Sequence, residues 1–152
     1  MSVRGRNLIV VAVDDSKYAP TVAKEAARMA LERKADVVFL SVIQVPSLSA
    51  SNGEINAESL NEEEKEFQNL HKTLIDTCFA PNSGILIESK ILHGNPGDKI
   101  VEYAEEADAD LIVMGTRGHG RLASALLGSV SKHVVHHSKR SVYIVKKEVP
   151  RA

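Results

Sequence analysis

The sequence has one cysteine, few aromatic residues and no long apolar run. Its single thiol, Cys78, can form neither an intrachain disulfide nor a structural zinc site, and we expect it to be half buried near a helix end. Aromatic residues make up 4% of the chain, too few for a platform that stacks nucleic-acid bases. The longest apolar run, residues 8–13, is too short to cross a bilayer and stops at Asp14 without a cleavage site. We therefore expect no membrane segment, no signal peptide and a cytoplasmic protein.

An excess of positive charge is also missing. The chain carries 19 Lys and Arg residues against 20 Asp and Glu residues, and this net charge of −1 argues against a dedicated nucleic-acid binder. The charges are unevenly spread, however, because residues 53–67 hold six acids and one base whereas residues 115–152 hold eight bases and one acid. Such runs are typical of two solvated faces, but the basic run also fits an anion site in the C-terminal quarter.

What remains is the composition of an ordinary globular protein. Hydrophobic residues make up 43% and charged residues 26% of the chain, which excludes disorder, collagen and a coiled coil. The length of 152 residues is sufficient to bury one core. With no internal repeat in sight, we expect residues 1–152 to form a single domain.

Short apolar segments alternate with segments of helical periodicity. The apolar segments predict strands at residues 8–13, 37–43, 85–92, 110–114 and 141–145. The amphipathic segments predict helices at residues 19–32, 59–78, 96–107 and 129–138. This alternation, with strands that are apolar on both faces, indicates an α/β fold: an open, doubly wound parallel sheet with helices on both faces.

The ends and faces of these elements give further expectations. Glu88 and Lys90 make one face of the third strand partly polar, which suits an edge strand. Residues 14–16 offer caps for the first helix, and Ser129 is suited to cap the last one. The valines of the last helix are expected to point inward: Val130, Val134 and Val135.

The site of ligand binding follows from the fold class. Such sheets bind ligands at the carboxyl ends of their strands, where the winding direction reverses. Asp14 follows the first strand, and a glycine-rich segment that begins at Gly115 follows the fourth. If the sheet runs outward from the first strand to the third and then returns to the fourth, the first and fourth strands are neighbours. The sequence then predicts a site between Asp14 and Gly115.

The glycine-rich segment combines several features of a phosphate site. Glycines let backbone N–H groups approach a phosphate, the following helix offers its N-terminus to an anion, and cations add positive field. The residues concerned are Gly115, Arg117, Gly118, Gly120, Arg121, Gly128, Ser129 and Lys132. The alternative is that the glycines only shape a tight connection, which accounts for single glycines better than for the whole set.

Two better-known phosphate motifs do not describe this segment. The Walker A pattern is absent. Residues 118–123 match the glycine pattern of dinucleotide-binding folds, but that pattern belongs in the first βαβ unit and is followed by an acid about 20 residues later. Here the match lies in the last unit, and the next acid is Glu148. We interpret it as fortuitous.

The histidines have less specific explanations. His133 and His137 are four residues apart on a helix, with His136 beside them, but no third metal ligand is evident and a position on the helix surface explains them better. His93 lies in a turn and His119 in the glycine-rich segment, from where both could reach the phosphate end of the site. No arrangement of residues indicates covalent catalysis, and we assign no catalytic residue.

The spacing of the glycines resembles a family signature. Gly115-x2-Gly118-x9-Gly128-Ser129 is similar to the ATP-binding signature of the universal stress protein family, G-2x-G-9x-G-[S/T]. Three further segments resemble strand segments of that family: residues 11–16, 111–114 and 141–145. The resemblance covers about residues 5–147 and implies a five-stranded parallel sheet in the order 3-2-1-4-5.

The resemblance also implies a ligand, ATP with Mg or Mn, and a set of contacts. Adenine would lie beside Ala12, Asp14 and Val42, with Asp14 near the ribose or the divalent ion. The triphosphate would lie on Gly115, Gly118, Gly128, Ser129, Val130 and Ser131. The candidate contacts are completed by neighbouring residues: Met114, Arg117, His119, Gly120 and Arg121.

We therefore expect an ATP-binding universal stress protein that acts as a nucleotide-dependent binding or signalling module. The alternatives are a slow ATPase or phosphotransferase in the same cleft and a ligand-free interaction protein. In the order 3-2-1-4-5 the last strand lies at an edge and is apolar, which predicts a homodimer through residues 141–146. We expect no nucleic-acid or membrane partner, and the sequence identifies no protein partner.

Overall fold

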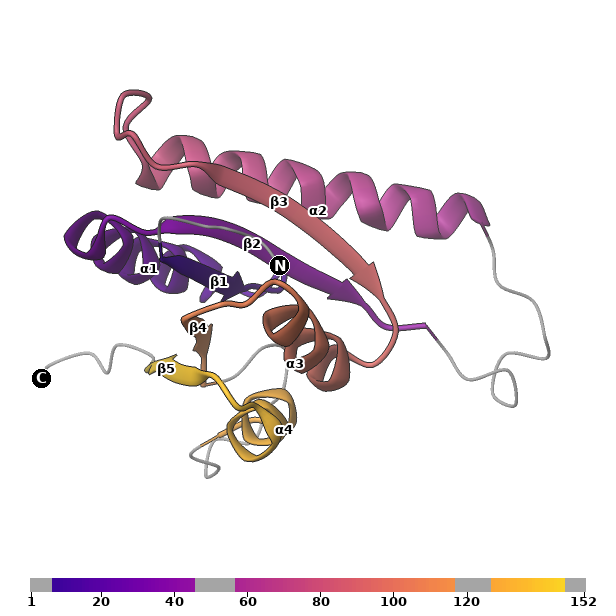
Figure 1. Cartoon of the computed structure of the whole chain (residues 1–152). Helices are drawn as coiled ribbons and strands as arrows, with labels where there is room; N and C mark the ends of the chain where they lie inside the picture. The colour runs from indigo at the N-terminus through magenta and orange to yellow at the C-terminus, as the bar shows by residue number, and fades with distance from the viewer. Residues whose placement is uncertain (1–6, 46–56, 117–126, 147–152) are drawn as a thin grey trace, which may run out of the picture.

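The computed structural model describes residues 7–45, 57–116 and 127–146. Five strands form one sheet: β1 (Leu8–Ala12), β2 (Asp36–Ile43), β3 (Ile87–His93), β4 (Leu111–Gly115) and β5 (Ser141–Val145). Four helices connect them: α1 (Ala19–Arg33), α2 (Ala57–Cys78), α3 (Pro96–Glu106) and α4 (Ser129–His137). The strand order is β3-β2-β1-β4-β5 and every neighbouring pair is parallel, which confirms the expected doubly wound α/β fold (Figure 1).

Helices cover both faces of the sheet, and each face has its own core. Because side chains alternate along a strand, Ile9 and Val11 of β1 pack against α1 and α2, whereas Val10 packs against α3 and α4. All five residues of β1 are buried, as expected of a central strand with helices on both faces. Among the helices of the described ranges, none combines the length and hydropathy needed to span a membrane.

The two edge strands differ in character. In β3 the side chains of Glu88 and Lys90 are exposed, in agreement with the predicted edge position. In β5, at the opposite edge, Val142 and Ile144 are partly buried against the core under α3 and α4. Tyr143 faces the other way, and its hydroxyl donates to a carboxylate oxygen of Glu25 on α1 at 3.1 Å. These three side chains of β5 therefore make contacts within the chain.

The prediction that residues 14–16 cap α1 is wrong. The residue at the cap position is Tyr18, and no side chain there accepts a helix N–H group. The chain makes one more turn before the helix begins at Ala19, so the polar side chains before it bond to backbone within that turn instead. Pro20 lies in the first helical turn, as expected from its fixed φ and missing N–H group.

The start of α4 also differs from the prediction. Gly128 occupies the cap position with extended backbone, and Ser129 is the first helical residue with an exposed side chain, so Ser129 does not cap the helix. Val134 is fully buried and Val130 partly buried, but Val135 is 43% exposed. Consecutive helical residues point about 100° apart, so a helix that buries Val134 turns Val135 toward solvent.

Candidate functional site

A cavity of about 420 Å³ lies where β1, β2 and β4 end, at the predicted reversal of winding. Nine of the residues expected to contact a nucleotide line it: Ala12, Asp14, Val42, Met114, Gly115, Gly128, Ser129, Val130 and Ser131. Five more expected contacts lie outside the described residues: Arg117, Gly118, His119, Gly120 and Arg121. The fold therefore brings the end of β1 and the start of α4 to one space.

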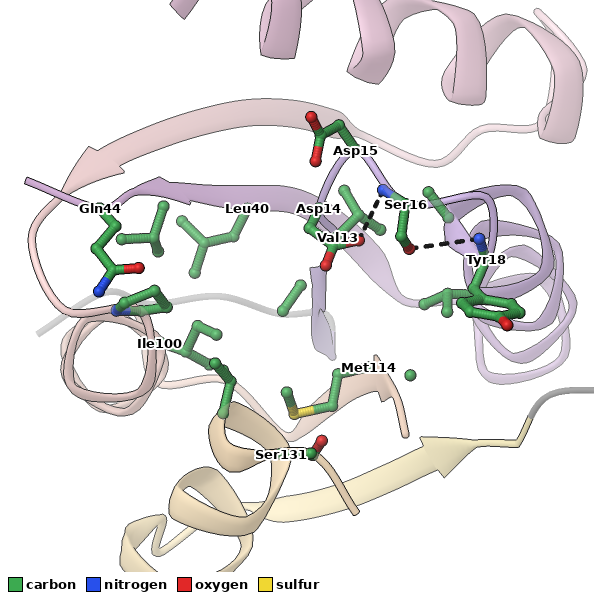
Figure 2. Close-up of a pocket in the computed structure, with 18 of the residues that line it drawn as sticks. Val13, Asp14, Asp15, Ser16, Tyr18, Leu40, Gln44, Ile100, Met114 and Ser131 are labelled. Carbon is green, nitrogen blue, oxygen red and sulfur yellow. Dashed lines mark hydrogen bonds between the residues drawn. The ribbon is translucent and has the colours of Figure 1, made fainter. Parts of the chain in front are cut away.

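Other residues around the cavity were not predicted from the sequence. They include Tyr18, Leu40, Gln44, Phe67, Pro96 and Ile100. Figure 2 shows Gln44 at the end of β2 and Tyr18 before α1 at opposite ends of the cavity, with Ile100 and Met114 between them. Gln44 had a usable signal, because it directly follows a strand that ends at the predicted site. Phe67 had none, since its position depends on how α2 packs.

The segment between β1 and α1 holds Asp14 at the cavity by local hydrogen bonds. One carboxylate oxygen of Asp14 accepts from the backbone N–H of Ser16 at 3.0 Å, and the Ser16 hydroxyl accepts from the N–H of Tyr18 at 3.3 Å (Figure 2). The Ser16 carbonyl accepts from the N–H of Ala19 at 3.2 Å. These turns fix the direction in which the Asp14 carboxylate leaves the backbone.

The N-terminus of α4 is tied to the end of β4. The carbonyl of Thr116 accepts from the backbone N–H of Gly128 at 2.6 Å and from the Ser131 hydroxyl at 2.9 Å. The helix ladder begins with the N–H of Lys132, which donates to the Gly128 carbonyl. The preceding N–H groups of residues 129–131 therefore have no acceptor within the helix, and together with the helix dipole they favour an anion.

A buried polar chain that the sequence analysis missed lies next to the cavity without lining it. The Ser41 hydroxyl donates to the carbonyl of Val13 at 2.6 Å and lies 2.7 Å from Nε2 of His71. Nδ1 of His71 lies 2.5 Å from the hydroxyl of Ser89. Because the Ser41 proton is used toward Val13, Nε2 carries the imidazole proton and Nδ1 accepts from Ser89. Burial lowers the pKa of His71 to about 4.

The other histidines within the described residues do not line the cavity. His93 ends β3 and lies 3.1 Å from a carboxylate oxygen of Glu64 on α2. His133 pairs with Asp98 at 2.9 Å, and its ring packs edge-on against that of His137 at a centroid distance of 4.2 Å. Within the described ranges, no group of three or more His, Cys, Asp or Glu residues is arranged to hold a metal ion.

Cys78 takes the structural role expected of it. It is partly buried against the core under α1 and α2, and burial raises the pKa of its thiol. A thiol that is held protonated in this way is a poor nucleophile. Cys78 therefore gives no indication of a second functional site.

The chain belongs to the universal stress protein family. The sequence model of this family matches residues 6–146 of the chain. Among its relatives, universal stress protein MJ0531 of Methanocaldococcus jannaschii is 36% identical over 150 residues, which cover 94% of this chain and 85% of that protein.

Solved structures agree with this assignment and show what similar proteins bind. The structure of MJ0577 has a TM-score of 0.81 at 26% identity and covers 95% of this chain and 99% of its own. A universal stress protein in complex with cAMP has a TM-score of 0.66 at 26% identity, with 94% and 98% covered. One from Archaeoglobus fulgidus in complex with dAMP has a TM-score of 0.64 at 28% identity, with 91% and 96% covered. Two similar proteins thus bind adenine nucleotides.

Proposed function

We propose that this protein binds ATP in the cavity between β1 and α4 and acts as a nucleotide-dependent binding or signalling module of the stress response in the cytoplasm. The observation that carries the proposal is that one cavity combines a slot lined by apolar side chains with the N-terminus of α4. An apolar slot suits a purine, and a helix N-terminus suits its phosphates. The adenine nucleotides bound by two similar proteins support the same ligand class.

Each part of the nucleotide has a place in this proposal. The adenine lies against Ala12, Leu40, Val42 and Ile100, which supply apolar surface. The ribose lies beside Asp14, whose orientation is fixed by its bond to the N–H of Ser16. The phosphates lie on residues 128–131 and Gly115, together with Met114, Arg117, Gly118, His119, Gly120 and Arg121 as further proposed contacts.

A divalent ion would be held mainly by the nucleotide itself. Mg²⁺ keeps several waters and uses few protein ligands when it binds through phosphates. In the part of the chain that the structure describes, Asp14 and Asp15 are the carboxylates that line the cavity. Asp14 fits a single direct or water-mediated contact to Mg²⁺ or Mn²⁺, which adds charge neutralisation to the site.

Calorimetry with purified protein tests the proposal. We expect Mg-ATP to bind at micromolar concentration or tighter and nucleotide to be released when purified protein is denatured. Titrations with ADP, AMP and cAMP under the same conditions show how much affinity the terminal phosphates contribute. Absence of binding to every adenine nucleotide would contradict the proposal and favour a ligand-free interaction protein.

ATP turnover is expected to be far slower than in a kinase. Kinases turn over at about 1–100 per second because they position and neutralise the γ-phosphate in the transition state. Here backbone N–H groups would hold ground-state phosphate equally well, and such uniform binding does not accelerate chemistry. We expect phosphate release well below one per second under single-turnover conditions. Release at a kinase-like rate that is lost in Asp14→Asn would instead support an ATPase or phosphotransferase.

We also propose a homodimer through β5. This strand ends the sheet, so its outer backbone groups are available to the same strand of a second copy. Ile144→Lys would disturb the strand edge but would also damage the core, because Ile144 packs against it. Tyr143→Lys is a better test, since Tyr143 is 37% exposed and a lysine there places like charges near the two-fold axis.

Sedimentation velocity at micromolar concentration provides the measurement. We expect a dimer for the parent protein and a shift toward monomer for Tyr143→Lys, with an unchanged circular dichroism spectrum. Lys24→Ala, at an exposed position of α1 on the side of Cys78, controls for an altered surface charge. A parent protein that sediments as a monomer would rule out the proposed interface at this concentration.

A further inference from the structure

The buried polar chain of Ser41 and His71 connects two walls of the cavity. Ser41 lies within the apolar stretch 37–43 of β2 and is 1% exposed, and His71 on α2 is fully buried. Buried hydroxyl and imidazole groups are costly unless their hydrogen bonds are satisfied. Here the hydroxyl bonds to both Val13 and His71, and the second imidazole nitrogen bonds to Ser89. Two apolar side chains would fill the same space, so the presence of Ser41 and His71 suggests a role beyond packing.

The first wall is the segment that presents Asp14. The register between β1 and β2 ends at Ala12 opposite Leu40, and the N–H of Val13 still donates to the Leu40 carbonyl at 3.0 Å. Beyond that point the carbonyl of Val13 accepts from the side chain of Ser41. Ser41 therefore holds the last anchored peptide before the chain turns at Asp14.

The second wall is the stretch of α2 that contributes Phe67. His71 follows Phe67 by four residues, so the two side chains lie on the same face of the helix. Phe67 lines the cavity, whereas His71 reaches the Ser41 hydroxyl and the edge strand β3. The imidazole thereby fixes how α2 is rotated about its axis, and how far it lies from the sheet, at the turn that supplies Phe67.

We infer that Ser41 and His71 are positioning residues of the nucleotide site: together they set the Asp14 segment and the Phe67 turn of α2 at a fixed separation. Neither residue lines the cavity, so both act through the groups they hold. The inference rests on the proposed function for its ligand, but its structural part, the fixing of the Asp14 segment, can be measured without one.

The binding experiment compares the two ends of the polar chain. Ser41→Ala is expected to weaken Mg-ATP binding about tenfold, because it frees the Val13 carbonyl and leaves the imidazole N–H unpaired. Ser89→Ala is the matched control: it removes a hydroxyl from the same histidine, but on the exposed edge strand, and is expected to change affinity less than twofold. Ser41→Thr retains a hydroxyl and is expected to restore binding.

A double-mutant cycle separates positioning from general destabilisation. If Ser41 acts through the Asp14 segment, Asp14→Asn has a smaller effect on affinity in the Ser41→Ala background than in the parent protein. Additive effects of the two substitutions would overturn the positioning role.

Hydrogen exchange of the ligand-free protein gives the second readout. The N–H groups of Ser16 and Tyr18 are bonded to side chains of the Asp14 segment, so Ser41→Ala is expected to speed their exchange at least about fivefold relative to amides in α3. Ser89→Ala is expected to leave them unchanged. Equal exchange in both variants overturns the inference. If the parent protein binds no nucleotide, the proposed function fails and this exchange comparison alone decides the inference.

Discussion

Ser129→Asp is expected to weaken Mg-ATP binding about 100-fold while leaving the fold at least as stable as that of the parent protein. Ser129 is the first residue of α4, its side chain is exposed and it lines the cavity. An acid in the first turn of a helix is favourable by about 0.3–1 kcal/mol, because it faces the positive end of the dipole. The same charge competes with a phosphate for the same N–H groups.

The size of the effect follows from charge repulsion. Two unit charges about 5 Å apart repel by roughly 3 kcal/mol at an effective dielectric constant of about 20, which corresponds to about 100-fold in affinity. Ser129→Asn is the control, because it has the same shape without the charge. Calorimetry gives the affinities and urea unfolding the stabilities. Equal affinity of the aspartate and asparagine variants would place the phosphates elsewhere in the cavity.

A second large effect concerns the stability of the protein toward acid. The pKa of His71 is about 4 in the folded protein and 6.5 in a solvated histidine. As the pH falls from 6.5 toward 4, the unfolded chain binds a proton at this residue before the folded protein does. The contribution of His71 to stability is therefore complete above pH 6.5 and is lost by about pH 4, and its full size is about 3 kcal/mol.

Urea unfolding at several pH values measures this contribution. His71→Gln removes the ionisable group, so the free energy of unfolding should fall about 3 kcal/mol less between pH 6.5 and pH 4 than in the parent protein. The comparison uses the difference across pH, so a lower absolute stability of the variant does not affect it. His136→Gln, on the exposed face of α4, is the control: it gives the change in the free energy of unfolding between the same pH values when a surface histidine is removed. Parallel curves for the parent and His71→Gln would contradict the prediction.

The sequence predicted the sheet and the place of the cavity for a physical reason. Strands buried on both faces must be continuously apolar, and β1 and β4 are short runs of this kind that end at a polar residue or a glycine. Because the carboxyl ends of parallel strands lie on one side of a sheet, the sequence alone places Asp14 and Gly115 close together. The expected strand bounds differ from the observed ones by at most two residues.

The parts that escaped prediction depend on the packing of whole helices. Phe67 and His71 lie on α2, whose periodicity predicts a helix but gives no information on which turn meets the cavity. The caps were misassigned because one extra turn before α1 shifts its start, and because Gly128 precedes α4 with extended backbone. Ser41 could have been noticed in the sequence as a hydroxyl within an apolar stretch of β2. Its partner His71, however, is thirty residues away in the sequence.

The two hydrogen bonds that Thr116 accepts from the start of α4 have a practical use. They join residue 116 to residue 128, so the two ends of the intervening segment are held together independently of its sequence. Lengthening a closed segment costs little free energy, since the cost rises only with the logarithm of its length. A reporter group inserted between residues 122 and 126 is therefore expected to leave β4 and α4 in place as a fixed frame, while the proposed nucleotide contacts at residues 117–121 are retained.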